Sequence, residues 1–196
     1  MKIYFLLVLL MLLANCSNQI EERIVYSKYF EGVIESKCNY IKGTDTKEGL
    51  CITFNRHGDT LTKSVYSKGK LNGKQLSYMN NNIVSVENYK NNELDGLVKT
   101  FFANGKPKYE VVYKSGLLWN VNFIYDDRGN KLDKGSFKDG NGILKVYYGN
   151  GKLKDKGLMK NGRATGEWLN FTETGAKQKV IYENGYDDWG IEVIFF

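Results

Sequence analysis

The residues of this chain that could do chemistry are few and stand apart from one another. The single histidine, His57, lies beside a turn glycine and has no second histidine or cysteine at metal-ligand spacing. Two pairs of adjacent aspartates, Asp126-Asp127 and Asp187-Asp188, lie in turn-like segments, where an aspartate bonds its own backbone. A calcium site would need roughly six to eight oxygen ligands. We therefore predict no metal site, no cofactor and no enzymatic activity.

Two cysteines, Cys38 and Cys51, stand on either side of the turn-like segment 43–49. The residues around each of them read as strands, so we expect the two to be antiparallel neighbours across that turn. The register of the two strands decides between two alternatives. One is a disulfide, which an oxidising compartment would allow; the other is a pair of buried free thiols.

The elements that must position these residues form a repeat. A glycine or an asparagine recurs every 22 to 24 residues, and an aromatic residue follows five positions later. The opening residues are Gly49, Gly73, Gly96, Asn120, Gly142, Gly166 and Gly190. The aromatic residues are Phe54, Tyr78, Phe101, Tyr125, Tyr147, Phe171 and Phe195. A fixed period of this length is typical of an array in which each unit contacts mainly its neighbours.

The clearest copy, residues 96–116, reads as one β-hairpin. Its central Asn104-Gly105 is a strong hairpin signal, because both central positions of a type I′ turn need a positive φ. We therefore predict an all-β fold, an elongated repeat array of antiparallel β-hairpins of about 23 residues each that form one continuous twisted meander sheet. Residues 23–48 read as a degenerate capping repeat, and residues 49–196 as six full repeats and a terminal half-repeat.

The aromatic residues at the fifth position should form one longitudinal stripe, because side chains alternate between the faces of a strand. The residues two positions before them, such as Ile52, Leu76 and Lys99, belong to the same face. We predict that this aromatic ladder is the core of the array. The alternative is an aromatic platform that binds a ligand.

The spacing G-x-x-x-x-(Y/F)-x-x-x-G resembles the MORN repeat, and more closely its bacterial variant with a Tyr-x-Asn-Gly turn. The corresponding turns here are Tyr89-Lys-Asn-Asn, Tyr113-Lys-Ser-Gly and Tyr182-Glu-Asn-Gly. The resemblance covers roughly residues 49–196, with departures at Asn82, Asn120 and Leu158. It implies a module that contacts proteins or lipids. Many bacterial proteins with such repeats are labelled antitoxins of the YwqK type, which implies a second function: an antitoxin or immunity protein that neutralises a partner toxin.

Residues 1–15 combine the positive Lys2 with an apolar run of signal-peptide length, which is too short to span a bilayer. The following Leu13-Ala14-Asn15-Cys16 resembles a bacterial lipobox, which implies cleavage before Cys16 and acylation of that cysteine. Residues 16–22 would then be a tether. We expect a lipid-anchored protein of the bacterial cell envelope, and by resemblance to Gram-negative lipoproteins Ser17 favours the outer membrane. The alternative is an ordinary signal peptide.

The charge pattern bears on the partners. The chain has a net charge of +6, with both signs spread over every repeat and no run of five like charges. This pattern predicts a solvated sheet surface, or a weak attraction to anionic lipid or polysaccharide. We expect no nucleic acid, a membrane reached through the lipid anchor, and a protein partner. The last residues, 191–196, form an edge strand without lysine or proline, which either pairs with a partner or is covered by its own chain.

Overall fold

The computed structural model describes residues 19–183 and 186–187, and this part of the chain consists of strands and turns. In the described residues no helix is long and apolar enough to cross a membrane. The strands are β1 (Ile20–Tyr26), β2 (Ile34–Ile41), β3 (Lys47–Phe54), β4 (Thr60–Ser67), β5 (Lys70–Met79), β6 (Asn82–Lys90), β7 (Glu93–Leu94), β8 (Gly96–Phe101), β9 (Pro107–Lys114), β10 (Leu117–Ile124), β11 (Gly142–Tyr147), β12 (Leu153–Lys160), β13 (Arg163–Phe171), β14 (Lys177–Glu183) and β15 (Tyr186–Asp187).

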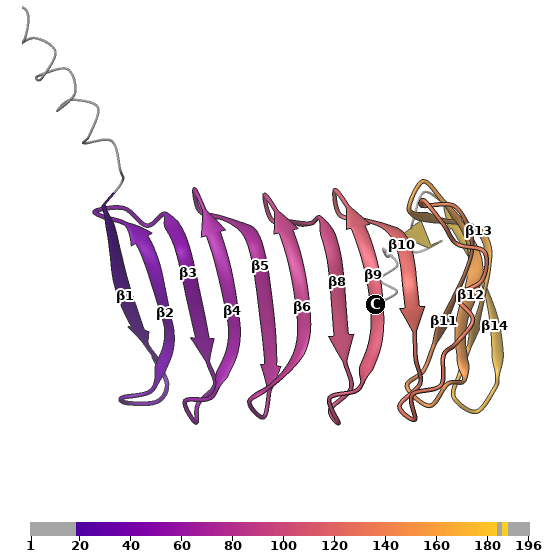
Figure 1. Cartoon of the computed structure of the whole chain (residues 1–196), viewed down its shortest axis with the longest axis horizontal. Helices are drawn as coiled ribbons and strands as arrows, with labels where there is room; N and C mark the ends of the chain where they lie inside the picture. Colours follow the sequence, from indigo (N-terminus) through magenta and orange to yellow (C-terminus); the bar gives the residue numbers. More distant parts are fainter. Residues whose placement is uncertain (1–18, 184–185, 188–196) are drawn as a thin grey trace, which may run out of the picture.

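The predicted array of antiparallel hairpins is confirmed (Figure 1). Strands β1 to β10 follow one another in a first sheet, in which β7 pairs with β6 beside the main path, and β11 to β15 form a second sheet. The expected tether is shorter than residues 16–22, because Ile20 already pairs with Ile41. The signal peptide, Cys16 and Ser17 lie outside the described residues, as does the edge segment 191–196.

The array is not one continuous sheet, because the ladder is interrupted between β10 and β11. Residues 125–141 occupy the position where the next hairpin strand is expected. Isolated bridges form within this segment, between Tyr125 and Lys131 and between Lys138 and Asn141. Local side-chain bonds replace the ladder there: Gly135 N donates to Asp133 Oδ1 at 2.8 Å, and Ile143 N donates to Ser136 Oγ at 3.0 Å. Short polar side chains compete with the ladder in this way, which explains the break.

From β4 onward, the upper turn edge in Figure 1 is made of two-residue turns that follow the second strand of a hairpin, whereas the β2–β3 connection spans residues 42–46. Their first residue has a positive φ, 50° at Lys68 and 47° at Ser115. A side chain beside the preceding upper turn, at the start of the same hairpin, accepts the backbone N–H of that residue: Glu48 from Lys68 at 2.6 Å, and Asp95 from Ser115 at 3.1 Å. Asn141 does the same further along the array. These contacts tie each turn to the previous one.

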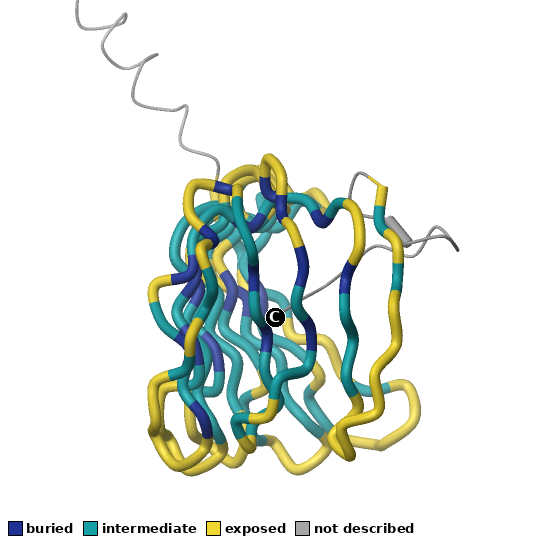
Figure 2. Tube along the Cα trace, turned by 90° about the vertical axis from the view of Figure 1, so that its right-hand side faces the viewer, coloured by how far each residue is buried: buried dark blue, intermediate teal, exposed yellow. Residues whose placement is uncertain are grey.

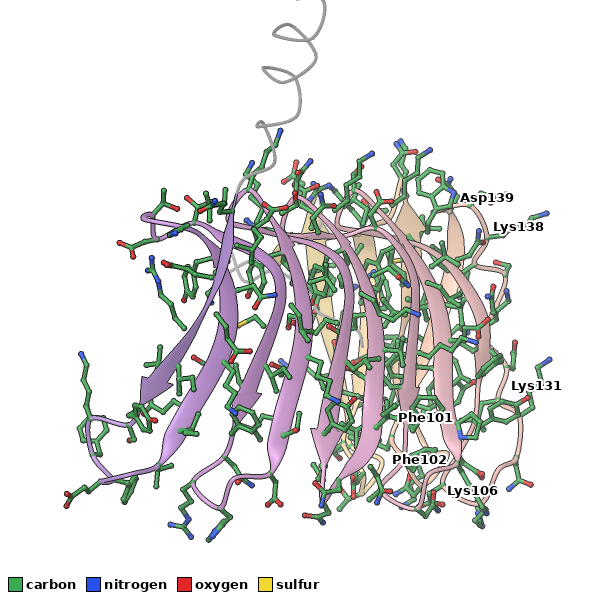
Figure 3. All side chains as sticks on the ribbon, turned by 60° about the vertical axis from the view of Figure 1, so that its left-hand side comes forward. Phe101, Phe102, Lys106, Lys131, Lys138 and Asp139 are labelled. Atoms are coloured by element: carbon green, nitrogen blue, oxygen red, sulfur yellow. A yellow bond between two sulfur atoms is a disulfide. The ribbon has the colours of Figure 1, made fainter. Side chains whose placement is uncertain are left out.

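In turns of the lower edge, the first residue accepts a hydrogen bond that closes the turn. An asparagine or an aspartate accepts it with its side chain, and another residue accepts it with its backbone carbonyl. Figure 3 shows Phe101, Phe102 and Lys106 near this edge and Lys138 with Asp139 at the opposite one. Lys106 Nζ reaches across to the carbonyl oxygen of the next turn, at Arg128, at 3.1 Å. Both edges therefore connect neighbouring hairpins, as expected for a repeat array. Figure 2 shows that the turns of the lower edge are exposed, whereas the buried stretches lie within the strands and at parts of the upper edge.

The core lies on one face of the array, which we call the inner face. Its buried apolar residues come from both sheets and form one cluster: Val98, Tyr109, Val111, Leu118, Val121, Ile124, Phe137, Leu144, Val146, Met159, Ala164 and Trp168. Val98, Leu144 and Trp168 each stand two positions after an opening glycine. The core is therefore concentrated where β8 to β13 and residue Phe137 meet.

The prediction that the aromatic ladder is the core is wrong for the residues that the structure describes. The half-buried members of the ladder are Phe54, Tyr78, Phe101, Tyr125, Tyr147 and Phe171. Only Tyr147 packs against the edge of the buried cluster. The reason is the strand period: the second and fifth positions are three residues apart, so they face opposite sides. Phe195 lies outside the described residues.

Candidate binding surface

The face opposite the core, which we call the outer face, carries one row of residues that crosses the whole first sheet. Each member is the direct cross-strand partner of the next. The row consists of Ile24, Lys37, Ile52, Lys63, Leu76, Val86, Lys99, Glu110 and Phe123. Eight strand spacings of about 4.8 Å make it roughly 38 Å long. We call it the outer row.

The ladder aromatics flank the outer row. Lys63 Nζ lies 5.5 Å from the centre of the Tyr78 ring, within the range of a cation–π contact. At the far end, the rings of Phe123 and Tyr125 lie 5.1 Å apart and are tilted by 47°. Exposed aliphatic side chains lie on the same sheet, among them Leu50 and Val65. The outer face therefore offers alternating rings, aliphatic groups and lysines to the solvent.

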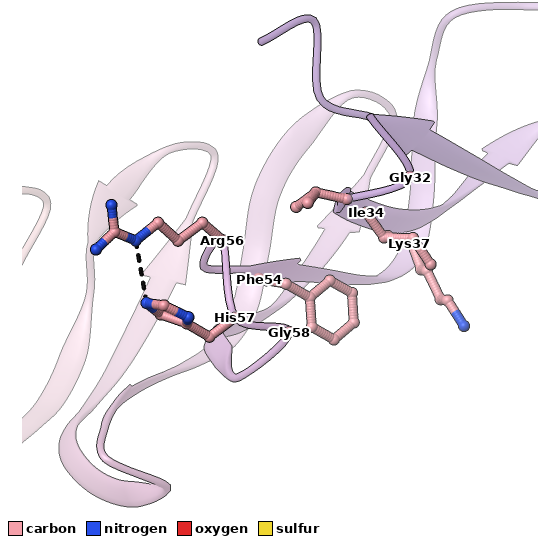
Figure 4. A pocket seen from close by; sticks show the side chains of 8 residues that line it. Gly32, Ile34, Lys37, Phe54, Arg56, His57 and Gly58 are labelled. Carbon is pink, nitrogen blue, oxygen red and sulfur yellow. Dashed lines mark hydrogen bonds between the residues drawn. The ribbon is translucent and has the colours of Figure 1, made fainter. Parts of the chain in front are cut away.

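A hollow of about 350 Å³ lies where the outer row meets the lower turn edge. Phe54, Ile34 and Lys37 line it, and Figure 4 shows Lys37 on one side of the Phe54 ring and the Arg56–His57 pair on the other. Arg56 Nε donates to His57 Nε2 at 3.0 Å, so this ring nitrogen is the acceptor (Figure 4). His57 is the exposed turn residue that the sequence predicted.

The inner face of the N-terminal half is polar. Glu87 accepts three hydrogen bonds there, from the Tyr89 hydroxyl at 2.8 Å, the Ser85 hydroxyl at 2.9 Å and the Gln75 amide at 3.2 Å. Burial, followed by the bond to Glu87, raises the pKa of Tyr89 above its usual range. Burial also raises the pKa of Tyr113 to about 12. The carboxylate of Glu87 is thus held on the face opposite Lys37 and Lys63.

Cys38 and Cys51 form a disulfide, which settles the alternative that the sequence left open. The two residues are direct partners in the register of β2 and β3. Both are almost fully buried on the inner face. The bond joins the capping repeat to the first full repeat.

The aspartate pairs do not build a cation site in the described residues. No group of three metal-ligating side chains occurs in that part of the chain. Asp126 instead closes its own turn, since Oδ1 accepts from the backbone N–H groups of Arg128 at 3.1 Å and Asn130 at 2.7 Å. Its bond to the Asn130 amide is the main cause that lowers the pKa of Asp126 to about 2. Asp187 ends β15, and Asp188 lies outside the described residues.

Reasoning from the sequence found the outer row only in part: Ile52, Leu76 and Lys99 were placed on one face with the ladder, whereas the members on second strands were missed. Lys37 and Lys63 lie in the second strands of their hairpins, whereas Lys99 lies in a first strand. They share no position in the repeat, so no periodic signal connects them. Only the pairing register, with its bulges, brings them into one row.

Comparison with known proteins supports the repeat. A family model described as MORN repeat variant matches residues 94–115 and 141–161. These segments contain the β8–β9 and the β11–β12 hairpins. No curated protein matches the chain. MORN repeats are in general motifs that bind proteins or membranes.

Proposed function

We propose that this protein is a non-catalytic binding scaffold that a lipid on Cys16 holds at the bacterial cell envelope, in the outer membrane. The ligand or partner, a protein or another cell-surface component, contacts the outer face. The array contributes a long and regular surface, and the anchor keeps that surface close to the membrane.

The observation that carries the proposal is the half-exposed aromatic ladder beside the outer row. An exposed apolar patch that is rimmed by polar residues is a mark of an interaction site. Here Leu50 is 44% exposed and Val65 is 38% exposed, next to half-buried rings and lysines. Among the residues that the structure describes, no second sheet covers this face in the N-terminal half, because β11 to β13 pack on the inner side at the other end.

The anchor rests on the segment Leu13 to Cys16, whose pattern fits a lipobox. Several acyl chains on one cysteine would hold the protein stably, at about 0.8 kcal/mol for each buried methylene group. In a cell-fractionation experiment, Cys16→Ser should release the chain from the membrane fraction or leave the precursor uncleaved. Fractionation of this variant with membranes, as for the parent, would refute the anchor.

The partner can be sought by affinity capture from detergent-solubilised membranes with the full chain. The double variant Lys37→Gln/Lys63→Gln should lose the captured component. Lys70→Gln/Lys90→Gln is the matched control, since both lysines are exposed and lie at strand ends of the same sheet. If both variants capture the same components as the parent, the outer face is not the binding surface. Recovery of a toxin would favour the second function, an immunity protein.

A further inference from the structure

We propose that the outer row binds a linear acidic polysaccharide, which lies along the array and crosses the strands. This inference rests on the proposed function, because it names the ligand class of the same surface. It concerns the segment of the row from Lys37 on β2 to Lys99 on β8.

The first argument is charge complementarity. Lys37 and Lys63 have no carboxylate partner among the described residues, whereas Lys99 Nζ lies 2.7 Å from Glu110. The carboxylate of Glu87 is held on the other face of the sheet. Between β2 and β8 the outer row thus contains lysines and aliphatic residues and no acid, so it attracts an anionic ligand.

The second argument is the position of the rings. Phe54 lies beside Lys37 in one hollow, and Tyr78 lies under Lys63. A sugar ring has an apolar face that packs on an aromatic ring, while its carboxylate reaches a neighbouring cation. Each pair thus combines a lysine from the second strand of one hairpin with a ring from the first strand of the next, and supplies one ring and one lysine for such a unit.

The third argument is the spacing. Lys37 and Lys63 are two strands apart in the row, which is roughly 10 Å. A β-1,4-linked chain presents the same ring face at every second sugar, and this disaccharide repeat has about the same length. The distance from Lys37 to Lys99 is five strand spacings, or roughly 24 Å.

The geometry favours a glycan over an acidic peptide. An extended peptide binds a sheet by pairing its backbone with a free edge. The segment of the outer row from Lys37 to Lys99 crosses strands that each have a paired neighbour on both sides. A ligand on this face is therefore recognised through side chains alone, which suits a polymer with hydroxyl groups, ring faces and carboxylates.

The test uses the purified full chain in detergent and defined oligomers of β-1,4-linked mannuronate. The matched neutral ligand is the β-1,4-linked mannose oligomer of the same length, in which a hydroxymethyl group replaces each carboxylate. Calorimetry should detect binding of the acidic oligomer and no binding of the neutral one. Affinity should rise with length until the oligomer spans roughly 24 Å and should fall as salt is added.

Two sets of variants separate the contributions of charge and ring. Lys37→Gln/Lys63→Gln should lower the affinity roughly tenfold and weaken its salt dependence, as expected for two lost exposed charge contacts. Tyr78→Leu should lower the affinity and leave the salt dependence unchanged. Lys70→Gln/Lys90→Gln should bind like the parent. The lysine variants remove no buried group, so they keep the test valid if Tyr78→Leu is unstable.

Several results would overturn the inference: no binding of the acidic oligomer, equal binding of the neutral oligomer, or binding that does not depend on Lys37 and Lys63. Binding of anionic lipid vesicles with the same lysine dependence, without binding of the oligomer, would assign the row to a lipid surface instead. The Cys16→Ser variant should still bind the oligomer. The glycan inference and the membrane anchor can therefore fail independently.

Discussion

Gly157→Ala tests the packing of the core most directly. Gly157 on β12 is the cross-strand partner of Trp168 on β13, whose side chain is fully buried. A Cβ atom at Gly157 would lie 2.1 Å from Trp168 Cδ2 and 2.3 Å from Cγ and Cε2. Non-bonded carbon atoms normally stay about 3.5–4.0 Å apart. The indole ring would therefore have to retreat by more than about 1 Å.

The cost of this retreat has two parts. Overpacking a close-packed core costs about 1–3 kcal/mol. Trp168 Nε1 donates to the carbonyl oxygen of Leu158 at 3.1 Å, and loss of this buried bond costs about 1–3 kcal/mol. The alanine regains about 0.4–1 kcal/mol by restricting the unfolded chain. We expect a net loss of about 1–5.6 kcal/mol in the free energy of unfolding, or a Tm lower by roughly 2–22 °C.

The measurement is urea and thermal unfolding followed by far-ultraviolet circular dichroism. Gly149→Ala is the matched control, because its Cβ would meet only the far end of the Phe102 ring, at 3.4 Å. We expect this control to change the stability by less than about 1 kcal/mol. In a Trp168→Leu background the penalty of Gly157→Ala should shrink, since residues in contact are not additive. Equal stability of the two alanine variants would refute the close packing of Trp168 on Gly157.

Three further predictions concern the disulfide and two titrating groups. Cys38→Ser/Cys51→Ser should lower the free energy of unfolding by about 3 kcal/mol, as expected for a disulfide that closes a loop with a sequence separation of 13. If reductant leaves the unfolding midpoint of the parent protein unchanged, this expectation is contradicted. Tyr113 has its pKa raised to about 12, so the stability that it contributes is complete below pH 10 and is lost as the pH rises towards 12; Tyr113→Phe should reduce this alkaline loss in a pH series of thermal melts. Asp126 has its pKa lowered to about 2, so its contribution is present above about pH 4 and is lost as the pH falls towards 2. Asp126→Asn should flatten the pH dependence of the Tm over that acid range, and an unchanged acid transition would count against the turn assigned to it.

The hairpins could be predicted because their signals are local. A glycine or asparagine that adopts a positive φ marks each turn, as at Gly58, Gly105 and Asn92, and the period follows from those marks. The interruption at residues 125–141 was not predicted. Its segment ends in an aromatic residue, Phe137, like other second strands, and Phe137 is even fully buried. The bonds of Asp133 and Ser136 that break the ladder become visible only in the folded chain.

The choice of the core face could not be predicted for a different reason. The sequence shows that Phe101 and Val98 face opposite sides, but which side is covered depends on where the second sheet lies. Val98 is buried because residues of β10 to β13 join the same cluster, an arrangement set by contacts between distant segments. The outer row depends in the same way on register. The disulfide could be predicted in part. The sequence indicated that both cysteines lie on neighbouring strands, but it did not indicate that they are direct partners.

The disulfide also decides how the array would respond to mechanical force. A pull on the N-terminal end would peel β1 from β2, and the pairs between them would break one after another, beginning at Ile20 and Ile41. The peeling would then reach Cys38, where the covalent bond passes the tension directly to Cys51 on β3. The segment from Ile20 to Cys38 would thus be pulled into an extended chain, which is roughly 60 Å long at about 3.3–3.6 Å per residue. Beyond that length, the tension would reach the full repeats, while the strands that carry most of the outer row remain paired.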